Sequence, residues 1–177
     1  DFGSQYTQLI ARRIREAQVY SQILPCTASL ATILAYRPQG IVLSGGPSSV
    51  YEKKAPSVAK ALFDQGIPIL GICYGMQLVT HLSGGKVVKA PHREYGRADL
   101  LIDDRSDLFK GIGTGGSSVV WMSHGDRIER MPPGFRSIAH TSNSPVAAMK
   151  LDDEQRRIYC LQFHPEVAHT PEGAKIL

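Results

Sequence analysis

The chain has 177 residues, of which 42% are hydrophobic and 20% charged, and its net charge is +4. This composition is typical of one globular domain with a core, and no apolar run approaches the roughly 18 residues that cross a bilayer, so we expect no membrane partner. The basic residues are scattered without interleaved aromatic side chains, which argues against nucleic acid as a partner. The three cysteines form no C-x-x-C motif, which argues against disulfides or structural zinc and favours a reducing, cytoplasmic location.

Hydrophobic periodicity and turn residues predict alternating helices and strands in the first half of the chain and mostly strands in the second. In chain order, the first half is predicted to contain a helix at 5–17, a strand at 19–24, a helix at 29–35, a strand at 40–44, a helix at 55–65, a strand at 67–72 and a helix at 74–82. The second half is predicted to contain strands at 86–88, 99–102, 118–122, 136–140, 146–150 and 158–163. This order favours an α/β fold over residues 1–177: an open, mostly parallel twisted sheet with helices on both faces and an antiparallel extension.

A Gly-Ile-Cys-Tyr-Gly sequence at residues 71–75 lies between a predicted buried strand and a predicted helix. A G-x-C-x-G motif at such a junction is the thiol counterpart of the nucleophile elbow, which projects its central residue from the carboxyl end of a strand. The start of the helix also favours a thiolate. A buried structural cysteine is the alternative, but the flanking glycines and the junction favour Cys73 as a nucleophile.

A nucleophilic cysteine needs a base, and His164 follows the strand predicted at 158–163. Glu166, two residues further on, could accept a hydrogen bond from one imidazole nitrogen and leave the other facing the thiol. A His-Pro-Glu sequence alone favours a polar loop. Its pairing with a thiol motif at another strand end predicts a Cys73–His164–Glu166 triad.

Acyl transfer also needs an oxyanion hole. The backbone amide of Tyr74 follows the nucleophile and is one candidate donor. Gly46 lies in the Gly-Gly-Pro sequence that ends the strand predicted at 40–44, and a residue without a side chain can bring its amide close to a substrate. Taken alone, this sequence is only a loop.

With these residues in place, the chain resembles the class I, or triad-type, glutamine amidotransferases, and among them the glutaminase domains of GMP synthetases. The resemblance covers essentially the whole chain. The narrower likeness depends on Cys-Tyr-Gly-Met-Gln at 73–77, Met-Ser-His-Gly-Asp at 122–126 and His-Thr at 169–170. It implies the triad above, oxyanion amides from Gly46 and Tyr74, and glutamine binding by Gln77, Ser123 and His124, the last two through their main chain.

The resemblance also implies partners. L-glutamine would be the substrate, with no cofactor and no metal in this domain. Ammonia would pass to an ATP-pyrophosphatase (synthetase) domain on the same full-length chain, which uses ATP and Mg to convert XMP to GMP in a homo-oligomeric enzyme. That domain's Ser-Gly-Gly-x-Asp-Ser loop does not occur in these residues. Arg93, Glu94, Tyr95 and Gly96 are expected to dock it, although an ordinary charged loop is an equal alternative.

Two other classes of function stay open. Another thiol hydrolase on the same fold, such as a γ-glutamyl hydrolase or peptidase, would differ in substrate. A non-catalytic binding module is disfavoured because all three triad positions are filled. His164-x-Glu166 is also similar to a zinc deaminase motif, but the Pro-Cys-x-x-Cys partner of that motif is missing.

Overall fold

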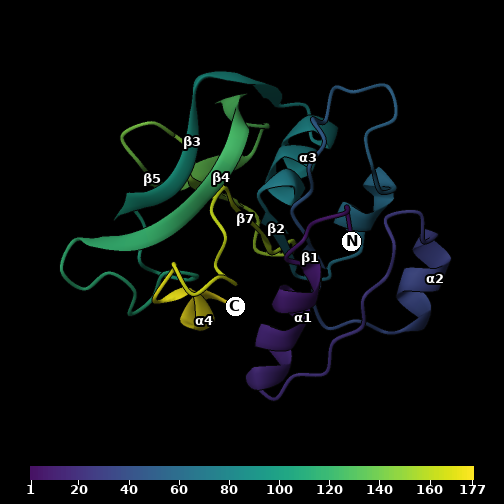
Figure 1. Cartoon of the computed structure of the whole chain (residues 1–177). Coiled ribbons are helices and arrows are strands. Elements are labelled where there is room, and N and C mark those ends of the chain that lie inside the picture. The colour runs from purple at the N-terminus through teal and green to yellow at the C-terminus, as the bar shows by residue number, and fades with distance from the viewer.

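The computed structural model of the chain describes residues 1–177, except for the side chains of Pro91 and His92. In this described part, seven strands form one sheet in the order β1-β2-β7-β6-β5-β3-β4 (Figure 1). The strands are β1 (Ile41–Leu43), β2 (Ile69–Ile72), β3 (Lys86–Ile102), β4 (Ser117–Arg130), β5 (Phe135–His140), β6 (Ala148–Leu151) and β7 (Ile158–Leu161). The α-helices are α1 (Thr7–Glu16), α2 (Leu30–Ala35), α3 (Tyr74–Leu82) and α4 (Gly173–Ile176), and a 3₁₀ helix spans Lys60–Asp64.

The sheet has a parallel part and an antiparallel part. Strands β1, β2 and β7 pair in parallel, and β7, β6, β5, β3 and β4 pair successively antiparallel. The predicted α/β sheet with an antiparallel extension is confirmed, but the sheet is mixed rather than mostly parallel. The reason is connection length: the short loops from β5 to β6 and from β6 to β7 leave no room for the crossover that parallel neighbours need.

Side chains on the parallel strands alternate between two helices. Ile69 of β2 packs in the same core cluster as the residues of α3, whereas Leu70 and Ile72 pack with Ile10 of α1. Because successive side chains of a strand point to opposite faces, α1 and α3 cover opposite faces of the sheet. Figure 1 shows this arrangement, with the strands between the two helices, and confirms the prediction of helices on both faces.

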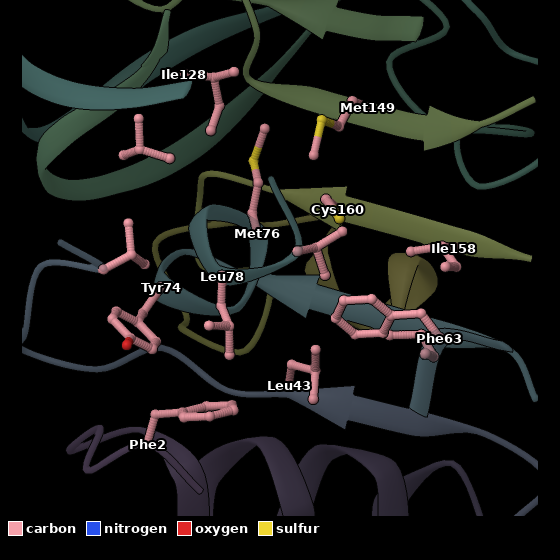
Figure 2. Packing of buried hydrophobic residues seen from close by; sticks show 14 of the residues in the cluster. Phe2, Leu43, Phe63, Tyr74, Met76, Leu78, Ile128, Met149, Ile158 and Cys160 are labelled. Carbon is pink, nitrogen blue, oxygen red and sulfur yellow. The ribbon is translucent and has the colours of Figure 1, made fainter. Parts of the chain in front are cut away.

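The larger core lies between α3 and the sheet. Figure 2 shows Met76 and Leu78 of α3 among Leu43 of β1, Met149 of β6 and Cys160 of β7, and these five side chains belong to one buried cluster. Each of them is at most 4% exposed. Burial on this scale stabilises the fold by roughly 1.5–3 kcal/mol per large apolar side chain, so this core fixes the position of α3 against the strands.

Two predicted elements are wrong. Residues 19–24 form no strand. Their backbone hydrogen bonds run to Ile14, in the last turn of α1, and to Asp1, so they lack the neighbouring strand that a ladder requires. The helix predicted at 55–65 is reduced to the 3₁₀ helix Lys60–Asp64. Pro56 disfavours helical geometry at the residue before it, and its carbonyl accepts a hydrogen bond from the Tyr74 hydroxyl of α3.

The segments predicted at 86–88 and 99–102 belong to one long strand, β3, which forms a curved hairpin with β4 (Figure 1). The alternative of an ordinary charged loop at residues 93–96 is therefore wrong, because these residues belong to β3. The register of β3 against β4 shifts between Lys89 and Glu94. An irregularity of this kind changes the pairing without ending the strand, so β3 continues through the segment that the sequence did not predict as a strand.

Candidate active site

Cys73 lies at the sharp turn between β2 and α3. Its backbone angles, φ 52° and ψ −105°, are ones that L-residues rarely adopt, as at other nucleophile elbows. The turn is anchored by the Cys73 amide, which donates to the Leu161 carbonyl of β7 at 2.7 Å. Gly75 brings α3 against β1 so closely that a Cβ would lie 2.2 Å from the Leu43 carbonyl oxygen. The sequence prediction of an elbow at Cys73 therefore agrees with the backbone.

His164 and Glu166 lie in the turn after β7. The Nδ1 of His164 is 2.7 Å from Oε1 of Glu166, and both side chains are buried. Burial alone would lower the pKa of His164, but hydrogen bonds and charges from Cys73 and Glu166 raise it to about 10. The structure therefore brings together all three side chains of the predicted triad.

Gly45 lies close to both the nucleophile and the base. A Cβ at Gly45 would lie 3.3 Å from Cε1 of His164 and 3.7 Å from Cβ of Cys73. The next residue, Gly46, packs against the start of the chain, where a Cβ would lie 2.6 Å from the Phe2 carbonyl oxygen. A side chain at Gly46 would therefore collide with the backbone, while one at Gly45 would crowd the base, and the loop predicted to carry an oxyanion donor lies beside the triad.

Other residues that hold the base were not recognised as site residues in the sequence. The Thr170 hydroxyl donates to the His164 carbonyl at 2.7 Å and accepts from the Trp121 amide at 3.1 Å. The Arg13 side chain of α1 donates to the Glu166 carbonyl at 3.1 Å. His-Thr at 169–170 is visible as a motif, but its partner on β4 is 49 residues away, so no local pattern could reveal its role.

A cleft of about 650 Å³ opens above Cys73. Most predicted glutamine-binding and oxyanion residues line it, and the Cys73 Sγ lies 3.7 Å from the Ser123 carbonyl. Tyr74 is buried beneath it, with its amide in the first turn of α3, where no intrahelical partner exists. The lining residues are Gly46, Pro47, Ser48, Ser49, Tyr51, Cys73, Gln77, Lys89, Arg93, Tyr95, Ser123, His124, Gly125 and Asp126.

Asp126 organises one side of the cleft. Its carboxylate accepts hydrogen bonds from the hydroxyls of Tyr51, at 2.7 Å, and Ser49. Its carbonyl accepts a bond from the Gln77 side chain at 3.3 Å. Sequence reasoning cited Asp126 only as part of a motif and missed Ser49 and Tyr51, because they meet it from a loop more than 70 residues earlier in the chain.

The four residues predicted as a docking surface fall on β3 and divide into two groups. Arg93 and Tyr95 line the cleft, and Tyr95 is 61% exposed. Glu94 is only 7% exposed and bonds to His124 inside the fold, because neighbouring side chains of a strand point to opposite faces. The Glu94 side chain is therefore not available to a partner, which corrects its place in the predicted surface.

Among the side chains that the structure describes, no three His, Cys, Asp or Glu residues lie together as a metal site would require. No described helix combines the length and the apolar character needed to span a bilayer.

The site thus combines a thiol at a strand–helix elbow with a buried His–Glu pair on an α/β sheet. The chain matches the model of the family "Glutamine amidotransferase class-I" over residues 1–177, and it belongs to this family. Its relatives include proteins named "GMP synthase [glutamine-hydrolyzing]". The one from Wolinella succinogenes is 55% identical and the one from Nitratiruptor sp. 56% identical, each over 181 residues. These alignments cover 100% of this chain and 34% of each relative, so the chain spans about a third of their length.

A solved structure supports the same grouping. It is the crystal structure of a protein from Thermoplasma acidophilum described as a GMP synthase subunit, with a TM-score of 0.88 and 35% identity to this chain. The match covers 99% of this chain and 86% of that one. Both comparisons agree with the resemblance drawn from the sequence.

Proposed function

We propose that this chain hydrolyses the side-chain amide of L-glutamine to glutamate and ammonia. The observation that carries the proposal is the elbow cysteine, Cys73, beside the buried His164–Glu166 pair at the foot of a polar cleft. Family membership and the names of the relatives support glutamine as the substrate. The cleft is also large enough for an amino acid, since ligand pockets commonly occupy about 300–1,000 Å³.

In the first half of the reaction, the Cys73 thiolate forms a bond to the amide carbon of glutamine. The resulting oxyanion accepts hydrogen bonds from the backbone amides of Tyr74 and Gly46. The protonated His164 then gives its proton to the nitrogen, the C–N bond breaks, and ammonia leaves. A γ-glutamyl thioester remains on Cys73, and Glu166 stabilises the imidazole in the correct orientation.

In the second half, His164 takes a proton from a water molecule, whose oxygen attacks the thioester carbon. The C–S bond then breaks, and glutamate and the Cys73 thiolate are released while the proton stays on the imidazole. Thiol and imidazole supply all of this chemistry, so no cofactor is needed in these residues.

For the longer protein, we propose that the ammonia reaches a synthetase domain that converts XMP to GMP with ATP and Mg. The support is that this chain covers a third of relatives named GMP synthases. Arg93 and Tyr95, which line the cleft, and Gly96, which follows them on β3, would contact that domain. A cytoplasmic location fits the three free thiols, Cys26, Cys73 and Cys160.

The proposal is tested by glutamate release from glutamine. Cys73→Ala should lower the rate by at least about 10⁴-fold, because the nucleophile is lost, while Cys26→Ala, which removes a thiol outside the cleft, should keep the wild-type rate. In the longer protein, Cys73→Ala should still form GMP from ammonium salts. Glutamine hydrolysis by the Cys73 variant would refute the assignment, and a preference for γ-glutamyl dipeptides would favour the other thiol hydrolases.

A further inference from the structure

A buried polar cluster lies behind the cleft wall, and it is centred on Glu94. Its Oε1 accepts a hydrogen bond from the Thr141 hydroxyl at 2.9 Å. Its Oε2 lies 2.7 Å from the Ser144 hydroxyl and 3.1 Å from Nε2 of His124. All four side chains are less than 9% exposed. A carboxylate that is removed from water needs such partners, so the cluster stabilises the ionised form of Glu94.

The other ring nitrogen of His124 also faces an acceptor. Nδ1 lies 2.8 Å from the backbone carbonyl oxygen of Asp126. The Asp126 carbonyl and an ionised Glu94 carboxylate can only accept, and the Ser144 hydroxyl, 3.4 Å from Nε2, lies closer to Glu94, at 2.7 Å. With Glu94 ionised, the geometry points to donation by both ring nitrogens of His124, that is, to an imidazolium. Burial alone would raise the pKa of Glu94, but hydrogen bonds from His124 and two hydroxyl groups lower it, which agrees with a carboxylate on the other side of the pair.

The ion pair joins two strands at the site. Glu94 on β3 and His124 on β4 are direct register partners, followed by Tyr95 and Ser123. The register shift between β3 and β4 ends at Glu94, and from there the two strands pair regularly again. The pair therefore fixes β4 at the point where it becomes the wall of the cleft.

That wall contacts the reacting groups. The Ser123 carbonyl lies 3.7 Å from the Cys73 Sγ. The Asp126 carbonyl accepts from both His124 and the Gln77 side chain. Resting on the proposed glutaminase activity, we propose that Glu94 and His124 are positioning residues of the glutamine cleft: as a buried carboxylate–imidazolium pair, they hold the wall at residues 123–126 in place against Cys73 and Gln77.

Glu94→Gln tests the proposal, because it keeps the size of the side chain and removes its charge. A matched control is Asp103→Asn, which removes the carboxylate from an exposed histidine pair, His140–Asp103, with a separation of 2.9 Å. Three quantities are measured in each protein: KM and kcat for glutamine, the rate at which iodoacetamide alkylates Cys73, and the nitrogen NMR shifts of the His124 ring.

We expect wild-type His124 to show two protonated ring nitrogens and Glu94→Gln to show one. KM for glutamine should rise about tenfold or more, with a smaller change in kcat, because the wall holds glutamine equally in the ground and transition states. The elbow and the triad keep their own hydrogen bonds, so the alkylation rate of Cys73 should change by a smaller factor than KM, through the Ser123 carbonyl that contacts its sulfur. Asp103→Asn should match the wild type in all three.

If Glu94→Gln folds poorly, Ser144→Ala removes one hydrogen bond to Glu94 and a 3.4 Å contact with Nε2 of His124. This variant should raise KM by a smaller factor in the same direction. A single protonated nitrogen on wild-type His124, or an unchanged KM in both variants, would overturn the proposal. A wild-type protein that releases no glutamate would overturn the proposed function instead, and the NMR shifts would still decide for or against the ion pair.

Discussion

His164 is held from several directions at once. Its Nδ1 bonds to Glu166 and its carbonyl to Thr170, while its ring meets the edge of Tyr6, with centroids 5.2 Å apart and planes at 69°. These contacts fix the imidazole before substrate binds, so little reorientation is needed when the proton moves. At the scale of the residue, the catalytic power of the site depends on this preset orientation.

Glu166→Gln should leave a glutaminase kcat roughly 10 to 100 times higher than that of His164→Ala. The reason is that Glu166 orients and stabilises the imidazolium without exchanging the proton. The Glu166 charge also raises the pKa of His164, so the variant should titrate His164 at a lower pH than the wild type. Single-turnover assays and NMR titration measure the two effects. A Glu166→Gln variant as inactive as Cys73→Ala would mean that the carboxylate takes part more directly.

At the scale of elements, the site depends on how closely α3 approaches the strands. The amide of Gly75 donates to the Ser44 carbonyl at 3.1 Å, and a Cβ at Gly71 would lie 2.9 Å from the Gly75 backbone. These contacts leave no room for a side chain at position 71 or 75, which explains why a glycine stands two residues before and two residues after Cys73.

Gly75→Ala should therefore destabilise the fold by about 3 kcal/mol or more, because its Cβ would lie 2.2 Å from the Leu43 carbonyl oxygen and the helix would have to move. Urea unfolding followed by circular dichroism measures the loss. Gly115→Ala is the control, since a Cβ there meets nothing within 4 Å. Equal stability of the two variants would show that α3 can shift away from β1 at little cost.

At the scale of the whole molecule, the two parts of the sheet meet at the cleft. Parallel strands β2 and β7 lead into the turns that carry Cys73, His164 and Glu166, and the antiparallel β3–β4 hairpin supplies the opposite wall. A movement of the hairpin would change the distance between the wall and the nucleophile. A misplacement of about 1 Å can cost 10²-fold in rate, so this arrangement suits control by a partner at the exposed rim around Tyr95.

We therefore expect the isolated chain to be folded but slow, and the longer protein to hydrolyse glutamine at least about tenfold faster when ATP and XMP are bound. The measurement is glutamate release by the isolated chain, by the longer protein alone, and by the longer protein with both substrates. Equal rates in all three samples would contradict the coupling and leave the triad assignment intact.

The sequence alone determined the features that depend on neighbouring residues. The elbow at Cys73 and the helix after it could be read from G-x-C-x-G and its flanking apolar runs, and the structure has that helix at Tyr74–Leu82 as predicted. His164 and Glu166 are two residues apart, so one short motif contained both. Glycine spacing and hydrophobic periodicity are local properties, and they are visible without a fold.

Only the tertiary structure decided which distant residues meet. Whether Glu94 faced a partner or the interior depended on the register of β3 against β4, because a shift of one residue exchanges the two faces of a strand. The failed strand at 19–24 and the shortened helix at 55–65 depended on pairing and on the contact between Tyr74 and Pro56. Thr170, Ser49 and Tyr51 acquired their roles in the same way, since each contacts the site through a residue distant in the chain.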